Sequence, residues 1–212
     1  YSPEKLKEII QIQLDAANAT LTFDCHFHYL KEEGQIWEDE KTSVECFKVN
    51  HRIECWGFLF KEKRNPRTIL PSAVHQYQVP TSFYENLQQG ENFIDENGKE
   101  IINEILTMPG KREKSYAFCA DTAYYEPICK YIFEADLVYH EATYLDELQT
   151  RAHSRYHSTS KQAALIAKKA CVSKLIIGHF SSMYETLEKF KEEACEIFEN
   201  SEIAEEGVSY LV

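Results

Sequence analysis

The sequence predicts an α/β fold, and the prediction depends mainly on its second half. Three short apolar runs with strand character lie at 116–120, 137–139 and 175–177. Helical spacing of apolar residues follows the first two runs, over 126–133 and 159–170. Each apolar run also ends at a polar or charged residue, which is where α/β folds place their ligands.

The other elements follow from two periodicities, the helical one of 3.6 residues and the strand alternation of 2. Turn residues such as Gly34, Asn65-Pro66 and Pro109-Gly110 separate them. In chain order we expect a helix at 4–15, strands at 21–29, 43–50 and 54–62, a short helix at 81–88, strands at 91–95 and 99–106, a helix at 185–199 and a strand at 208–212.

Composition narrows the class of protein. The chain has 212 residues, of which 43% are hydrophobic, and no apolar run reaches the roughly 18 residues that a membrane helix needs. Its seven cysteines form no CxxC pair, which predicts reduced thiols and a cytoplasmic location. The net charge of −12 argues against indiscriminate nucleic-acid binding, although a local basic groove is compatible with it. Basic side chains gather at Arg151, Arg155, Lys161, Lys168, Lys169 and Lys174.

Several histidines and carboxylates stand where chemistry is expected. Imidazole nitrogens and carboxylate oxygens are the ligands that zinc accepts, and a carboxylate can bridge two metal ions. For any one such residue, a cap or a core hydrogen bond is the commoner explanation. Three such residues at the ends of successive strands favour a functional site. The candidates are His51, Asp121, His140, Glu141, His153, His157 and His179.

Four short motifs, in order, give the sequence a family resemblance. They are Cys119-Ala120-Asp121-Thr122, His140-Glu141-Ala142-Thr143, His157-Ser158-Thr159 and Gly178-His179-Phe180-Ser181, preceded by the stretch from Val49 to Phe58. Together they resemble ribonuclease Z of the metallo-β-lactamase superfamily, including its HEAT and HST loops. The resemblance covers about residues 40 to 184. It implies that 1–212 is the C-terminal part of one metallo-β-lactamase-fold domain, a partial αββα sandwich.

The resemblance also implies roles for individual residues. His51 would bind one zinc ion, Asp121 would bridge two, and His179 would complete the second. His157 would lie beside the scissile phosphate, Glu141 would hold its imidazole, and His140 would support the loop. Zinc would activate the water that attacks the phosphodiester, and manganese or iron could occupy such a site. The substrate implied is precursor tRNA, cut to leave a 3′-hydroxyl on the tRNA and a 5′-phosphate on the trailer. The assembly implied is a homodimer.

One expected motif is missing from the sequence. The superfamily's first metal motif, HxHxDH, does not occur in it. His26-Phe27-His28 lacks the Asp and the third His at the required offsets, so we interpret this pair as the outward face of a strand. We expect the true motif to precede residue 1, which leaves three of seven ligands in the chain. The prediction is that this polypeptide alone binds zinc poorly and is inactive.

Two further departures concern the substrate. An Arg that the family usually carries near the end of the last motif is replaced by Met183, so the resemblance leaves phosphate binding to Arg151, Arg155, Ser158 or Thr159. The family's tRNA-binding arm should fall within 66–110, a short segment with few basic residues here. An ordinary surface excursion is an equal alternative for it.

Two rival functions stay open. The chain could belong to another phosphodiesterase or hydrolase of the same superfamily, against which the paired HEAT and HST loops count. It could also be a non-catalytic domain for dimerisation or tRNA binding, which the absent HxHxDH motif favours.

Overall fold

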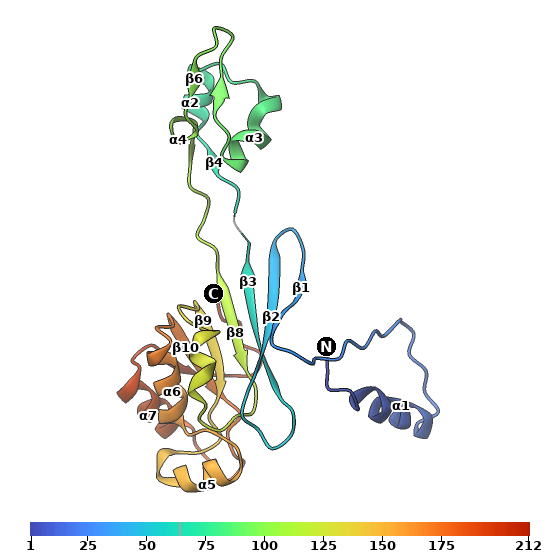
Figure 1. The fold of residues 1–212 in the computed structure, drawn as a ribbon. Coiled ribbons are helices and arrows are strands. Elements are labelled where there is room, and N and C mark those ends of the chain that lie inside the picture. The colour runs from blue at the N-terminus through green and yellow to red at the C-terminus, as the bar shows by residue number, and fades with distance from the viewer. Residues whose placement is uncertain (64) are drawn as a thin grey trace. The chain divides into compact units, whose positions relative to one another are not determined.

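The computed structural model describes residues 1–63 and 65–212 and is built on a seven-stranded sheet (Figure 1). Contacts divide the chain into a larger unit (residues 1–38, 44–60 and 115–212) and a smaller unit (residues 39–43 and 61–114). The strands of the sheet, in their spatial order, are β1 Gly34–Glu38, β2 Thr42–Lys48, β3 Trp56–Glu62, β8 Ser115–Cys119, β9 Leu137–Glu141, β10 Lys174–Gly178 and β11 Ser201–Ile203.

The helices of the larger unit are mostly short. Two of them are 3-10 helices, and the two that cover the sheet have ten residues each. They are α1 Leu6–Ala16, η2 Glu126–Lys130, η3 Asp146–Leu148, α5 Gln149–Ser154, α6 Ser160–Lys169 and α7 Glu188–Ile197.

The second half of the sheet is parallel, as its alternation with helices predicts. Strands β8 and β9 pair in parallel, as do β9 and β10, and β10 and β11. The register sets Cys119 beside His140, and Gly178 beside Glu141. Because the carboxyl ends of parallel strands meet at one edge, the residues that follow β8, β9 and β10 are brought together there.

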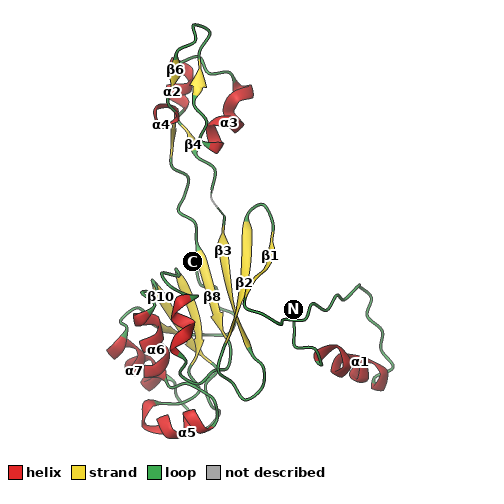
Figure 2. Cartoon of the chain, viewed as in Figure 1, coloured by secondary structure: helices red, strands yellow, loops and turns green. Residues whose placement is uncertain are grey.

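Helices α6 and α7 cover one face of this half of the sheet (Figure 2). Thr159 starts α6 with a capping box in which its hydroxyl accepts from the Gln162 amide and the Gln162 side chain accepts from the Thr159 amide. Small side chains on α6 allow the helix close to the sheet, and Phe190 of α7 is fully buried. This core includes Ala117, Val138, Leu175, Ile177, Ala163, Ala167 and Phe190.

The opposite face of the sheet carries aromatic side chains. Phe60 stacks on Tyr116, and Phe118 stacks on Tyr139. Phe60 remains 39% exposed and Phe118 36% exposed. The described residues thus place α6 and α7 on one face and leave aromatic surface on the other, which fits the expected part of an αββα sandwich.

The smaller unit has a hydrophobic core of its own, formed by Val74, Val79, Leu87, Ile101 and Leu106. Buried Asn103 supports it by donating to the carbonyls of Leu87 and Glu91. The segment 66–110, expected as an excursion, lies within this unit. Its elements are β4 Thr68–Ile69, α2 Pro71–Gln76, η1 Thr81–Phe83, α3 Tyr84–Gln89, β5 Phe93–Ile94, β6 Glu100–Ile101, α4 Asn103–Leu106 and β7 Thr107–Met108.

Three predicted strands are wrong wholly or in part. Residues 21–29 form no strand, and only an isolated bridge joins Tyr29 to Ser2, because alternation does not supply a partner strand. His26 and His28 are therefore exposed loop residues. The strand expected at 99–106 ends after Ile101, and α4 follows. No strand forms at 208–212, where Tyr210 instead donates to the Ile203 carbonyl, and 201–203 is the last strand.

Several helices also differ from expectation. The helix expected at 126–133 is a 3-10 helix over Glu126–Lys130, and the final helix α7 is shorter than the predicted 185–199. Helices α2 and α5 and strand β1 were not predicted. Helix α1 lies close to its predicted range but buries none of its residues.

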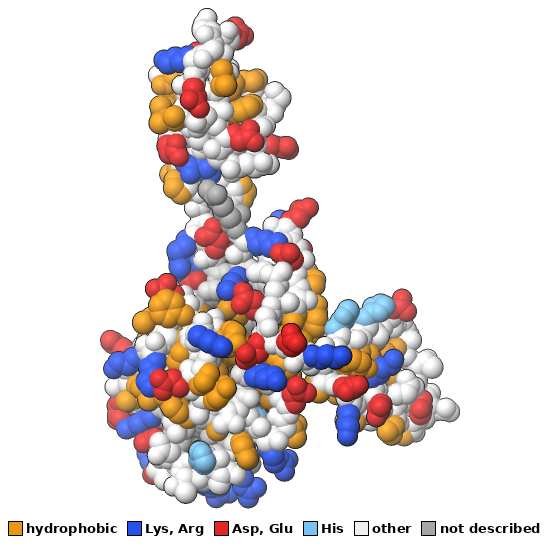
Figure 3. Space-filling model, viewed as in Figure 1, with side chains coloured by type: hydrophobic (Ala, Val, Ile, Leu, Met, Phe, Trp, Pro, Cys, Tyr) orange, Lys and Arg blue, Asp and Glu red, His pale blue; other side chains and the backbone are white. Residues whose placement is uncertain are grey.

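The surface and the thiols agree with the composition. On the face shown in Figure 3, acidic and basic side chains are interspersed over the larger unit. All seven cysteines are free. Within the described part of the chain, no helix combines the length and the apolar character required to cross a bilayer.

Candidate metal centre

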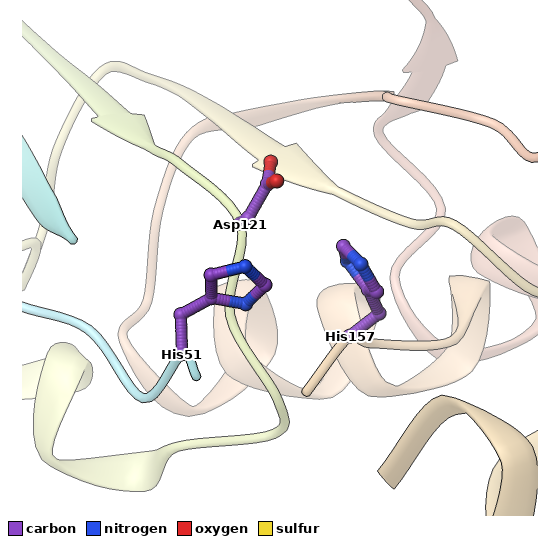
Figure 4. A group of neighbouring side chains, drawn as sticks. All are labelled: His51, Asp121 and His157. Carbon is purple, nitrogen blue, oxygen red and sulfur yellow. The ribbon is translucent and has the colours of Figure 1, made fainter. Parts of the chain in front are cut away.

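Most of the predicted site residues meet at the carboxyl edge of the parallel strands. Asp121 follows β8, His179 follows β10, and His51 lies in the connection between β2 and β3. His51, Asp121 and His157 lie close together (Figure 4), and one ligand atom from each lies within 4.8 Å of the others. The predicted ligand pair His51 and Asp121 is thereby brought together with the predicted catalytic His157.

His179 joins this group through Asp121. Its Nε2 lies 3.4 Å from Asp121 Oδ1, and its ring stacks on that of His157 at a centroid distance of 5.3 Å. The backbone of His179 has a φ of 62°, a left-handed conformation that is uncommon outside glycine and often marks functional positions. All three predicted ligands therefore lie in one cluster with Asp121 in contact with His179.

The Nδ1 atom of each of the three histidines is hydrogen-bonded to a carbonyl, a carboxylate or a hydroxyl of another residue. His51 Nδ1 lies 2.9 Å from the carbonyl oxygen of Tyr156, and His157 Nδ1 lies 2.8 Å from Glu141 Oε1. A carbonyl and a carboxylate only accept, so both Nδ1 atoms carry the proton. His179 Nδ1 lies 2.9 Å from the Thr143 hydroxyl. The Nε2 atoms therefore remain available to bind a metal ion, an arrangement typical of metal-binding histidines.

Glu141 is buried and anchors this arrangement. Its Oε1 accepts from the Thr122 amide (3.0 Å), His157 Nδ1 (2.8 Å) and the Ser158 amide (3.1 Å). Its Oε2 accepts from the amide and the hydroxyl of Thr143, at 3.0 and 2.9 Å. Glu141, His157 and His179 also lie close enough to suggest a second metal group. Five accepted hydrogen bonds leave the carboxylate no free lone pair for an ion there, so this group is a hydrogen-bonded support.

The contact with Glu141 also changes the acidity of His157. The hydrogen bond to Glu141 raises the pKa of the His157 imidazole, and partial burial opposes that change. The resemblance assigned Glu141 to hold this imidazole, and the geometry provides the bond by which it could do so.

His140 is fully buried and belongs to neither group of possible metal ligands. Its Nδ1 donates to the Glu141 carbonyl at 2.6 Å, and burial lowers the pKa of its ring. Its Nε2 has no partner among the described residues. His153 is exposed on α5 and lies outside both groups.

A cleft of about 450 Å³ opens beside the histidines. Arg155 lines it, as does Arg52, a residue that the sequence analysis did not single out although it directly follows His51. Arg151 is not among the lining residues, and its guanidinium lies over the Tyr144 ring at 5.6 Å. The lining residues are His51, Arg52, Tyr144, Ser154, Arg155, Tyr156 and His157.

The placement of Ser158 and Thr159 argues against direct phosphate contact by either side chain. Both are fully buried. The Ser158 hydroxyl donates to the Thr122 carbonyl at 2.7 Å, and the Thr159 hydroxyl donates to Asp146 Oδ1 at 3.1 Å. These bonds hold the loop that carries His157. Neither residue needs a ligand to satisfy its hydroxyl.

Comparison with solved structures identifies the class of protein. The metallo-β-lactamase-fold protein YhfI from Bacillus subtilis superposes with a TM-score of 0.59 at 15% identity, over 95% of this chain and 60% of that one. The short form of human tRNase Z superposes with a TM-score of 0.57 at 19% identity, over 97% and 64%. The chain has the metallo-β-lactamase fold.

Curated relatives identify the family. Proteins named ribonuclease Z match from Cytophaga hutchinsonii (42% identity over 220 residues), Parabacteroides distasonis (36% over 214) and Bacteroides thetaiotaomicron (37% over 214). Each match covers 100% of this chain and 68%, 70% and 68% of the relative. A comparison with models of protein families finds no match. The chain belongs to the ribonuclease Z family of endoribonucleases.

Proposed function

We propose that this chain is part of a zinc-dependent endoribonuclease that removes the 3′ trailer from precursor tRNA. The observation that carries the proposal is the cluster of His51, Asp121 and His157, which His179 joins through its contact with Asp121. The Nδ1 atom of each histidine is hydrogen-bonded to another group of the chain. Membership of the ribonuclease Z family supports a tRNA substrate.

The donor set fits zinc. Two imidazoles and a carboxylate are ordinary zinc ligands, and the free Nε2 of His179 already faces Asp121. His51, Asp121 and His179 would hold the metal. Zinc, when bound, supplies a Lewis acid that lowers the pKa of water to near neutrality and stabilises charge on the phosphate.

His157 is the proposed proton donor. Because Glu141 raises its pKa, His157 keeps a proton closer to neutral pH than an isolated imidazole would. Its ring lines the cleft, where it can protonate the departing 3′ oxygen. The expected products are a tRNA with a 3′-hydroxyl and a trailer with a 5′-phosphate.

Arg52 and Arg155 are the proposed phosphate contacts. Both line the cleft beside His51 and His157, and a guanidinium can contact a phosphate with two parallel hydrogen bonds. Residues 68–109 of the smaller unit offer a phosphate little electrostatic attraction, since Lys99 is the one Lys or Arg there against six acidic residues. That this unit binds tRNA stays a prediction.

We expect residues 1–212 taken alone to bind zinc weakly. Three ligands spread over two positions are fewer than the three or four per ion of a stable site. We expect well under one zinc per chain after dialysis, measured by plasma mass spectrometry, and no cleavage of precursor tRNA. Two tightly held zinc ions per chain would show that the ligand set is larger than proposed.

Activity is tested with a chimera. Residues 1–212 are joined to the portion of the Cytophaga hutchinsonii relative that they do not match, and the product is incubated with 3′-extended tRNA and zinc. We expect cleavage at the trailer, and its loss in the His157→Ala chimera. Cleavage of bis(p-nitrophenyl) phosphate but not of tRNA would favour a different phosphodiesterase. Cleavage of neither, with tRNA bound, would favour a non-catalytic domain.

Assembly and location are further parts of the proposal. A homodimer is proposed from the family resemblance, and sedimentation equilibrium of the chimera tests it. A cytoplasmic location is supported by the seven free thiols, which suit a reducing compartment. Fractionation of cells that express the tagged protein tests the location.

A further inference from the structure

We infer that Thr143 is a positioning residue through which Glu141 orients His179 as well as His157. Thr143 follows β9, is buried, and takes no part in the roles that the sequence assigned. The consequence for metal binding rests on the proposed function, since it needs His179 to be a ligand. The hydrogen-bond arrangement itself does not.

The Thr143 hydroxyl lies between the carboxylate and the imidazole. Its Oγ1 is 2.9 Å from Glu141 Oε2 and 2.9 Å from His179 Nδ1. The Thr143 amide also donates to the same Oε2, at 3.0 Å. The neighbouring loop is held as well, because the Ser181 amide donates to the Thr143 carbonyl at 3.1 Å.

Counting protons settles the direction of these bonds. A hydroxyl has one hydrogen, and a carboxylate oxygen that accepts an amide can only accept again. The Thr143 hydrogen therefore points to Glu141 Oε2, and a lone pair of Oγ1 faces His179. His179 Nδ1 must then carry the ring proton, which leaves a lone pair on Nε2, the atom 3.4 Å from Asp121 Oδ1.

His157 does not disturb this assignment. Its Nδ1 lies 3.2 Å from the Thr143 hydroxyl but 2.8 Å from Glu141 Oε1, so its proton goes mainly to the carboxylate. One buried carboxylate thus orients two stacked imidazoles, His157 through Oε1 and His179 through Oε2 and Thr143. The strand register makes this possible by setting Gly178 beside Glu141.

The backbone conformation of His179 and the exposure of its ring explain why the ring needs the hydrogen bond to Thr143. With φ at 62°, the backbone of His179 is in an uncommon conformation, and its exposed ring has the Thr143 hydroxyl as its Nδ1 partner. Valine in place of Thr143 keeps the shape and removes the hydroxyl. Serine keeps the hydroxyl and serves as the matched control.

The test observes the ring proton directly. Long-range proton–nitrogen NMR spectra of metal-free chain, recorded where the His179 ring is neutral, should show the Nδ1-protonated form in the wild type and in Thr143→Ser. In Thr143→Val that form should be lost in favour of the Nε2-protonated one. An Nε2-protonated His179 in the wild type would overturn the inference even if the valine variant failed to fold. Unchanged Nδ1 protonation in a folded Thr143→Val protein would overturn it too.

A zinc titration then separates this inference from the proposed function. In the chimera, competition with a fluorescent chelator should show zinc affinity about 10- to 100-fold weaker in Thr143→Val than with the wild-type Thr143, the range for lost support of a metal-binding histidine. Thr143→Ser should stay near the wild type. If the ring proton moves as expected while His179→Ala leaves zinc binding unchanged, Thr143 positions His179 and the proposed metal role of His179 fails.

Discussion

The buried carboxylate of Glu141 should be the most sensitive polar group of the larger unit. In Glu141→Gln one of its two oxygens becomes an NH₂ group, which cannot accept. Placed at Oε2, the NH₂ group meets the Thr143 amide and leaves that donor without a partner. A buried unsatisfied donor costs roughly 1–3 kcal/mol, and the three bonds to Oε1 also lose their charge assistance. We expect a total loss of roughly 3–5 kcal/mol in the free energy of unfolding.

Urea denaturation followed by tryptophan fluorescence measures this loss. Trp37 and Trp56 both lie in the larger unit, so the signal reports the unit that contains Glu141. Glu193→Gln is the matched control, because Glu193 is also a buried carboxylate but, among the described residues, accepts from two donors, the Asp146 amide and the Ser160 hydroxyl. It should cost roughly 1–2 kcal/mol. The reasoning is refuted if Glu141→Gln costs no more than Glu193→Gln.

Three other changes test the packing, the acidity and the cleft. A Cβ at Gly57 would lie 2.2 Å from Cε2 of fully buried Phe47, so Gly57→Ala should lower stability by roughly 1–3 kcal/mol in the same urea assay; an unchanged midpoint would contradict this packing. Burial lowers the pKa of His140, so the folded state binds fewer protons than the unfolded state below about pH 6.5, and stability should fall as the pH drops. Between pH 7.5 and 5.5 the wild type should lose up to about 1.4 kcal/mol more than His140→Gln, and equal losses would exclude this cause. Arg52→Ala in the chimera should weaken tRNA binding and reduce the slope of affinity against salt by about 1, whereas Arg151→Ala should leave the slope unchanged.

Local sequence was sufficient to predict the parallel half of the sheet and the meeting of Asp121, Glu141 and His179 at its edge. Alternation of apolar runs with helical spacing specifies parallel strands, and parallel strands bring their carboxyl ends together. Family motifs added the roles of His51 and His157, which no periodicity contains.

Tertiary structure decided the features that depend on a distant partner. The strand expected at 21–29 has the right alternation, but among the described residues only the isolated bridge between Tyr29 and Ser2 pairs with it. A pattern sets which side chains share a face but not what lies beside them. The family resemblance offered Ser158 and Thr159 as phosphate contacts, yet their hydroxyls are buried and donate to the Thr122 carbonyl and to Asp146.

The hydrogen bonds to the histidine rings also separate what the sequence determines from what the tertiary structure decides. His51 bonds to the carbonyl of Tyr156, 105 positions away, and His179 bonds to Thr143, 36 positions away. Residue types and their spacing determined which side chains could bind a metal or donate a proton. Only the folded chain decided which nitrogen of each ring faces the cluster, because that choice is made by hydrogen-bond partners from other elements.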